Sequence, residues 1–277
     1  MRVLKPIFDF YINSSIHVAL AVYALSWITL IEFGVSYDEN VLYFIFFASI
    51  TGYNFVKFFG LAKFHHRSLS RGLKIIQIFS FFCFLLMGFY AFRLHEETFW
   101  IVVGSAVVTF LYAIPFLPKK LLYDSKQNLR SISGLKAHVI ALVWAVVTVV
   151  LPLVNNQIEI DFNVMVTVLQ RFLFVLVLIL PFDIIDMRYD SLKLGTIPQT
   201  IGVKKTKILG VLFLILFFVL EFFKDKIVEV RTFVLLLVTL FSGLFVLFSH
   251  KDRSRYYSVF WVEALPIFWL ILIWMFG

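Results

Sequence analysis

Residues 164–190 read VMVTVLQRFLFVLVLILPFDIIDMRYD, an apolar run that ends in three aspartates. The apolar part, 164–182, is long enough to cross the ~30 Å hydrocarbon core of a bilayer as one helix. At about 100° per residue, Asp183, Asp186 and Asp190 fall within roughly 60° of one another on that helix. Three carboxylates on one face at a membrane boundary are costly unless a cation, a metal or a polar substrate lies beside them. This stretch therefore predicts a site where a membrane helix meets water.

The composition is that of a membrane protein. The 277 residues are 61% hydrophobic and 15% charged, and the mean hydropathy is +0.95, whereas a soluble domain is about half apolar and about a quarter charged. Apolar runs long enough to span a bilayer lie at about 14–33, 41–60, 75–92, 98–116, 135–154, 164–182, 206–223, 231–248 and 256–276. No polar stretch is long enough for a soluble domain. The sequence predicts an all-α polytopic protein with nine transmembrane helices in a single domain, 1–277.

The distribution of positive charge predicts the topology. Of the 25 Lys and Arg, 19 fall in segments on the N-terminal side of the membrane and 4 on the other side, while Lys57 and Arg171 fall inside apolar runs. By the positive-inside rule, the N-terminus is cytoplasmic and the C-terminus lies on the opposite side, in the inner membrane if the source is bacterial. This distribution explains the net charge of +8 without a nucleic-acid partner. The first apolar run has no small-residue cleavage site after it, so we expect a retained helix.

The aspartate-rich stretch resembles a known motif. Asp183 to Asp190, followed by Gly195-Thr196-Ile197-Pro198 and Gly202, is similar to the second aspartate-rich motif of the UbiA superfamily of intramembrane prenyltransferases. The segments LYAIP at 111–115, LRSI at 129–132 and GLK at 134–136 resemble the family's sequence around the fourth and fifth helices. The resemblance implies nine helices around a central cavity open to the cytoplasmic side. It also implies an isoprenyl diphosphate held through Mg²⁺ between two aspartate-rich motifs, and a lipophilic, for example aromatic, acceptor.

The resemblance assigns roles to individual residues. Asp186 and Asp190 have the family's metal-ligand spacing, and Asp183 is a further carboxylate one turn earlier; all three are candidate catalytic residues. Arg130 and Lys136 lie in the matched segment and are candidates for binding the diphosphate; the alternative for both is that they only set the topology as cytoplasmic positive charges. Magnesium prefers a few carboxylates together with substrate phosphate and water. The alternative for the three aspartates is a solvated helix end paired with neighbouring cations.

The first aspartate-rich motif is incomplete. In the family, the second helix carries an Asn followed by two or more Asp at helical spacing. Residues 51–62 read TGYNFVKFFGLA, and no Asp or Glu occurs from Val41 to Ile78. Asn54 is present, and Lys57 lies one turn later, where its ammonium is a candidate to replace the charge of one metal on the diphosphate. Asn54 and Lys57 are therefore candidate diphosphate-binding residues, and snorkelling to the interface is the alternative for Lys57.

Arg171 lies inside the sixth apolar run, where a guanidinium needs a partner. The candidate partners are Glu263 in the last run, Glu32 near the outer end of the first, and Glu159 in the preceding loop. The pair is either structural or, with Glu263, part of an acceptor pocket.

These patterns favour a prenyltransferase-like protein, with two alternatives from other classes. Because the first motif lacks carboxylates, a catalytically degenerate isoprenoid-binding or scaffolding protein also fits. CDP-alcohol phosphotransferases carry an Asp-Gly pair and a further Gly before their last two Asp, a pattern not found near 183–190. A secondary transporter would show paired broken helices in two halves, and the glycines of the apolar runs show no such pairing.

Overall fold

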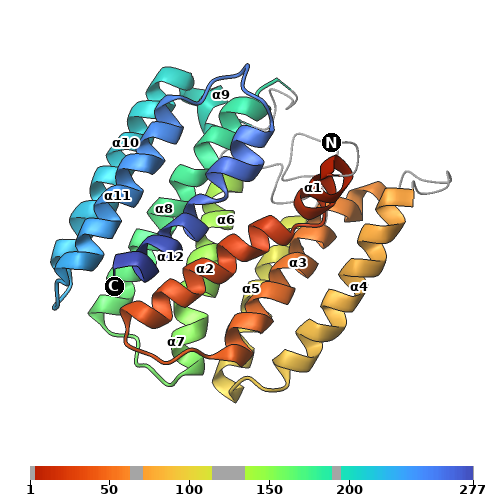
Figure 1. The fold of residues 1–277 in the computed structure, drawn as a ribbon, viewed down its shortest axis with the longest axis horizontal. Coiled ribbons are helices and arrows are strands. Elements are labelled where there is room, and N and C mark those ends of the chain that lie inside the picture. The colour runs from red at the N-terminus through yellow and green to blue at the C-terminus, as the bar shows by residue number, and fades with distance from the viewer. Residues whose placement is uncertain (1–3, 63–70, 114–134, 189–194, 277) are drawn as a thin grey trace, which may run out of the picture.

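The chain folds into long helices that lie side by side (Figure 1), and no strand occurs in residues 4–62, 71–113, 135–188 and 195–276, the parts that this computed structural model describes. The helices are α1 (Leu4–Asn13), α2 (Ile16–Glu32), α3 (Glu39–Ala62), α4 (Arg71–Ala91), α5 (Glu96–Ala113), α6 (Leu135–Ala145), α7 (Leu151–Asn155), α8 (Phe162–Asp186), α9 (Ile197–Ile201), α10 (Val203–Val219), α11 (Glu229–Leu247) and α12 (Leu265–Phe276). Two π-helical segments, η3 (Val146–Val150) and η6 (Tyr257–Val262), and a 3₁₀ turn, η5 (Leu220–Phe223), extend them.

The long helices surround a common interior. Helix α2 packs against α3 and α12, α8 packs against α6 and α10, and α11 packs against both α10 and α12. Helix α5 contacts both α3 and α6 and so closes the ring of packed helices. Helix α4 packs on α3. Helix α8 is the most buried of the candidate spans. Figure 1 shows α1 at one end of the bundle and the end of α12 at the other.

The helices agree with the predicted apolar runs, although the structure counts fewer spans. Among the described residues, seven helices are long and apolar enough to cross a membrane, or eight if the bent pair α1–α2 forms one span. Helix α5 occupies the position of the remaining run, 98–116, whose last three residues lie outside the described part. The protein is therefore an all-α, multi-pass chain, and the count of nine spans stays a prediction.

Aspartates fix two helix starts. The Asp161 carboxylate accepts a hydrogen bond from the backbone N–H of Val164 at 2.9 Å and caps α8. The Asp38 carboxylate accepts from the backbone N–H of Val41 at 3.2 Å and, with its other oxygen, from the Asn155 amide at 2.8 Å. Such caps satisfy N–H groups that have no partner inside the helix. Asp38 therefore ties the start of α3 to the end of α7.

The break between α1 and α2 is held by a buried asparagine. Ser15 has a positive φ of 66°, which is uncommon outside glycine, and the two helix axes differ by 56°. The Asn54 carbonyl oxygen accepts from the Ser15 hydroxyl at 2.8 Å. The Asn54 amide donates to the Ser14 backbone oxygen at 3.0 Å and to the Ser80 hydroxyl at 2.7 Å. Asn54 thus joins the break to α3 and α4.

Helix α10 approaches its neighbours closely at Gly210. A Cβ atom at this position would lie 2.9 Å from Cδ1 of Leu180 in α8 and 3.0 Å from Cγ1 of Val246 in α11. Small residues allow membrane helices to come close enough for extensive van der Waals contact. At Gly243 in α11, by contrast, the nearest atom would lie 3.6 Å from an added Cβ, which is ordinary contact.

Candidate functional site

A cavity of about 390 Å³ lies between α1, α2, α3, α5, α6 and η6. Its walls are mostly apolar, and they include side chains from five of these elements: Ile12, Val18, Val56, Val139, Ile140, Val143 and Val259. Its charged lining residues are Lys57, Lys136, Arg255 and Glu263. A mostly apolar cavity with a few charged groups is typical of a binding site for an amphipathic ligand.

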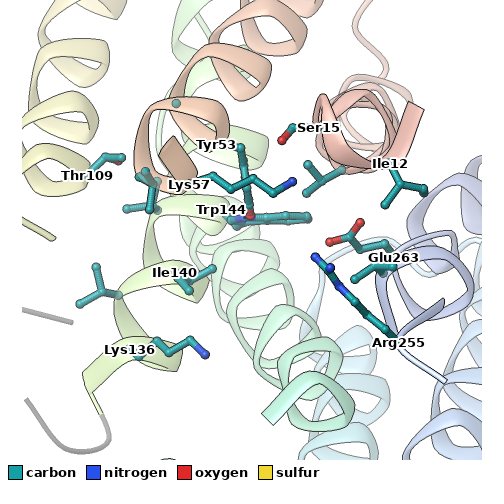
Figure 2. A pocket seen from close by; sticks show the side chains of 16 residues that line it. Ile12, Ser15, Tyr53, Lys57, Thr109, Lys136, Ile140, Trp144, Arg255 and Glu263 are labelled. Atoms are coloured by element: carbon teal, nitrogen blue, oxygen red, sulfur yellow. The ribbon is translucent and has the colours of Figure 1, made fainter. Parts of the chain in front are cut away.

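Three of the charged groups lie together. Figure 2 shows the ammonium of Lys57, the guanidinium of Arg255 and the carboxylate of Glu263 pointing into the same part of the cavity. The three charges interact with one another, although no ion pair within 4 Å joins Glu263 to either cation in the described part of the chain. Lys136 lies apart from this group in the same view.

Local structure sets these positions. Lys57 donates to the backbone oxygen of Asn13 at 3.0 Å, at the C-terminal end of α1, where helix carbonyls attract a cation. Glu263 directly follows the π-helical segment η6, and such segments are often found at functional sites. Arg255 lies just before η6 and is exposed.

A smaller cavity of about 160 Å³ adjoins the first one. The two share five lining residues: Tyr53, Lys136, Ile140, Trp144 and Glu263. The indole N–H of Trp144 donates to the Tyr53 hydroxyl at 2.8 Å, so these two rings form a common wall. The smaller cavity adds Asp186 and apolar residues of α8 such as Phe182. Asp186 therefore lies beside the space that the cations line.

The structure brings part of the predicted site together. Asp183 is 2% exposed, and its carboxylate accepts from the Lys136 ammonium at 3.1 Å, so α8 and α6 are joined by an ion pair. Asp190 and Arg130 lie outside the described residues. Their predicted roles, as metal ligand and diphosphate ligand, stay predictions.

The described donors do not fit the magnesium site that the family resemblance implies. Within the described ranges, no three His, Cys, Asp or Glu side chains come together where they could hold a metal. Helix α3 contributes Tyr53 and Lys57 to the cavity but no carboxylate. The carboxylate of Asp183 is engaged by Lys136. The charge chemistry of the larger cavity is that of an anion site.

Asn54 and Lys57 face different surroundings. Tyr53, Val56 and Lys57 line the larger cavity, whereas Asn54 lines neither cavity, is 3% exposed, and bonds to the α1–α2 break. At about 100° per residue, positions 54 and 57 are only about 60° apart around α3, so both side chains reach the α1–α2 break, where Lys57 bonds to Asn13 and Asn54 to Ser14. Lys57 therefore lines the cavity and Asn54 does not, and the role of Asn54 in binding diphosphate stays a prediction.

Sequence reasoning missed Arg255, Tyr53 and Trp144. Arg255 was counted only as a topology signal before the last span, and no local feature separates it from Arg253 or Lys251. The two aromatic residues are lost among 35 Phe, 11 Tyr and 6 Trp. Packing alone identifies them.

Arg171 has neutral partners. It is 1% exposed and donates to the Leu25 backbone oxygen and the Thr29 hydroxyl, each at 3.2 Å, and its guanidinium carbon lies 5.2 Å from the centroid of the Trp269 ring. The Thr29 hydroxyl donates in turn to the Thr148 backbone oxygen at 2.8 Å. Arg171 thus joins α8 to α2, η3 and α12.

The expected ion pair of Arg171 with Glu263, Glu32 or Glu159 is not found, since no carboxylate lies within 4 Å of it among the residues described. One backbone oxygen, one hydroxyl and an aromatic face surround the guanidinium, and all three are uncharged partners. Glu263 lines the cavity instead, and its role in an acceptor pocket stays a prediction.

The fold is similar to that of a solved membrane protein. The solved structure of digeranylgeranylglyceryl phosphate synthase, a prenyltransferase of the UbiA superfamily, is similar to this chain with a TM-score of 0.57 and 15% sequence identity. The similarity covers 99% of this chain and 97% of that one. At this identity the likeness shows the fold, and it confirms the UbiA-like architecture predicted from the aspartate-rich stretch. The sequence matches no protein-family model and no curated protein.

Proposed function

We propose that this protein binds an isoprenyl diphosphate in the two adjoining cavities and transfers the prenyl group to an aromatic or other lipophilic acceptor. One observation supports this above all: three cations and one carboxylate line a cavity whose walls are otherwise mostly apolar. The UbiA-like fold adds the context of a membrane prenyltransferase. The protein is further proposed to be one membrane domain with a cytoplasmic N-terminus, which reporter fusions at the two termini would test.

The cavity suits both parts of such a substrate. The larger cavity, at about 390 Å³, lies within the roughly 300–1,000 Å³ typical of ligand pockets. Lys57, Arg255 and Lys136 would bind the diphosphate, because ammonium and guanidinium groups form strong charge-assisted hydrogen bonds to phosphate. Apolar side chains such as Val56 and Ile140 would surround the prenyl chain.

The same residues support ionisation of the substrate. As the C–O bond breaks, the diphosphate leaves with the electron pair, and cations positioned beside it stabilise the developing negative charge. The ring faces of Trp144 and Tyr53 can stabilise the allylic cation by cation–π interaction. An electron pair of the acceptor then forms the new bond, and the acceptor releases a proton. Asp186 and Asp190 are the residues that the family resemblance assigns to Mg²⁺.

A second function is favoured by the donor set. Because α3 supplies no carboxylate to the cavity, the chain fits a protein that binds or presents an isoprenoid without turning it over. In that case the apolar cavity and the cations would serve binding alone.

Binding and transfer can be measured separately. The purified full chain in lipid nanodiscs would be titrated with farnesyl and geranylgeranyl diphosphate, and then incubated with lipophilic acceptors, with prenylated product detected by mass spectrometry. We expect saturable binding and a product with at least one acceptor. Binding without product over a broad acceptor panel would favour the non-catalytic function. The absence of saturable binding would contradict both.

A further inference from the structure

The cavity charges fall into two groups. Lys136 is neutralised by its 3.1 Å pair with the buried carboxylate of Asp183. Lys57 and Arg255 converge on another part of the cavity, and Glu263 is the carboxylate beside them. The described residues of this second group carry two positive charges and one negative charge. The excess positive charge of the cavity therefore lies on Lys57 and Arg255.

The two cations share one part of the cavity with the carboxylate of Glu263. Lys57 donates to the Asn13 backbone oxygen, a neutral acceptor. No carboxylate lies within 4 Å of either the Lys57 ammonium or the Arg255 guanidinium in the part of the chain that the structure describes. Like charges at short range repel, and an anion with several charges placed between them removes this repulsion. The arrangement fits an anionic ligand.

A divalent cation would be repelled in this part of the cavity. In this part of the cavity it would face the charges of Lys57 and Arg255, and Glu263 alone would offer a carboxylate among the described lining residues. Magnesium binds phosphates through carboxylates and water in an octahedral shell. Lysine and arginine bind phosphate directly, arginine with two parallel N–H donors. In this part of the cavity, direct hydrogen bonds from the lysine and the arginine to phosphate therefore take the place of a bridging metal ion.

We propose that Lys57 and Arg255 bind the diphosphate group directly, so that this protein holds its ligand without a metal ion. The inference rests on the proposed function and adds to it that the diphosphate is bound without a metal ion. Lys57 stands on α3, the helix that lacks carboxylates, and Arg255 approaches from the other side of the cavity, just before η6. The diphosphate would lie between α3 and η6.

Glu263 has an opposing effect in this arrangement. Its carboxylate attracts the same two cations and repels the diphosphate, so it weakens binding of the anion. Removing its charge while keeping its shape, as in Glu263→Gln, therefore strengthens binding. This increase is specific to a site formed by these three groups, because loss of a carboxylate that held a metal would weaken binding.

The test measures the binding of inorganic pyrophosphate and of a non-hydrolysable isoprenyl thiodiphosphate to the full chain in nanodiscs, in EDTA and in Mg²⁺. We expect equal affinity in both. Lys57→Gln and Arg255→Gln should each lower the affinity about tenfold or more, the loss of a hydrogen bond to a charged group, and Arg255→Lys should recover part of it. Glu263→Gln should raise the affinity several-fold. Lys251→Gln, which removes a nearby cation that does not line the cavity, should leave it unchanged.

Three other results would contradict the metal-independent site, the assigned residues or the proposed function. Binding that disappears in EDTA would overturn the metal-independent site and leave the proposed function standing. Binding in EDTA that neither Lys57→Gln nor Arg255→Gln weakens would overturn the assignment of the two residues. The absence of binding in both buffers would contradict the proposed function itself. Thermal unfolding of every variant, together with the charge-conserving Arg255→Lys, separates loss of a contact from loss of the fold.

Discussion

Replacing Asn54 by leucine separates the structural role of this residue from a role in binding diphosphate. The substitution removes three hydrogen bonds, to Ser14, Ser15 and Ser80, in a side chain that is 3% exposed. Interhelical hydrogen bonds in membrane proteins contribute on average about 0.6 kcal/mol and up to about 1.7 kcal/mol each. Three of them give an expected loss of about 2 to 5 kcal/mol in the free energy of unfolding.

The measurement is reversible unfolding in mixed micelles, followed by circular dichroism, with Thr51→Ala as the control. Thr51 lies one turn before Asn54 on α3, and its hydroxyl donates only to the Phe47 backbone oxygen of the same helix, at 2.8 Å. Its loss should change stability by less than about 0.5 kcal/mol, as for most substitutions that break no packing or network. Diphosphate affinity, measured on the same samples, should be unchanged in both folded variants.

Unchanged stability together with lost diphosphate affinity in Asn54→Leu would refute the structural role of Asn54. If Asn54→Leu unfolds like the unmodified chain but loses diphosphate affinity, Asn54 contacts the ligand and its bonds at the α1–α2 break contribute little. The expectation from the family motif would then be correct, and the orientation of Asn54 in the structure would not describe the ligand-binding state.

Three further experiments test packing and charge. Arg171→Met should change the free energy of unfolding by no more than about 2 kcal/mol, because the cost of burying the guanidinium offsets much of its bonding; a much larger loss in the same micelle assay would show that its hydrogen bonds and ring contact outweigh that cost. Gly210→Val should lower the free energy of unfolding by about 1–3 kcal/mol through overpacking. Gly243→Ala, where there is room for a methyl group, should leave it unchanged or raise it slightly. Equal effects of the two substitutions would show that α10 does not approach its neighbours closely at Gly210. A double-mutant cycle of Lys136→Met and Asp183→Asn should give a coupling energy of about 1–3 kcal/mol, and additive effects would show that the ion pair contributes nothing.

The sequence determined the class of the protein and the position of its helices. Each predicted apolar run overlaps a helix or a helical series of the structure. The prediction of the helices succeeds because a segment that spans a bilayer must form all its backbone hydrogen bonds internally and must be apolar over its whole length. Both properties can be recognised from a short stretch of sequence. The resemblance of the stretch from Asp183 to Gly202 to the UbiA motif also led to the observed fold.

The tertiary structure decided which polar side chains meet. Lys57, Lys136 and Arg255 come from α3, α6 and the segment before η6, and only the packing of these elements places them around one cavity. A cation near a span end has the same sequence signature whether it faces lipid headgroups or a ligand. The direction of Asn54 and the neutral partners of Arg171 were likewise undetermined, since helix rotation depends on packing against neighbours. The aspartate-rich stretch predicted the fold through its resemblance to the UbiA motif, whereas the packing of distant helices decided which charged side chains line the cavity.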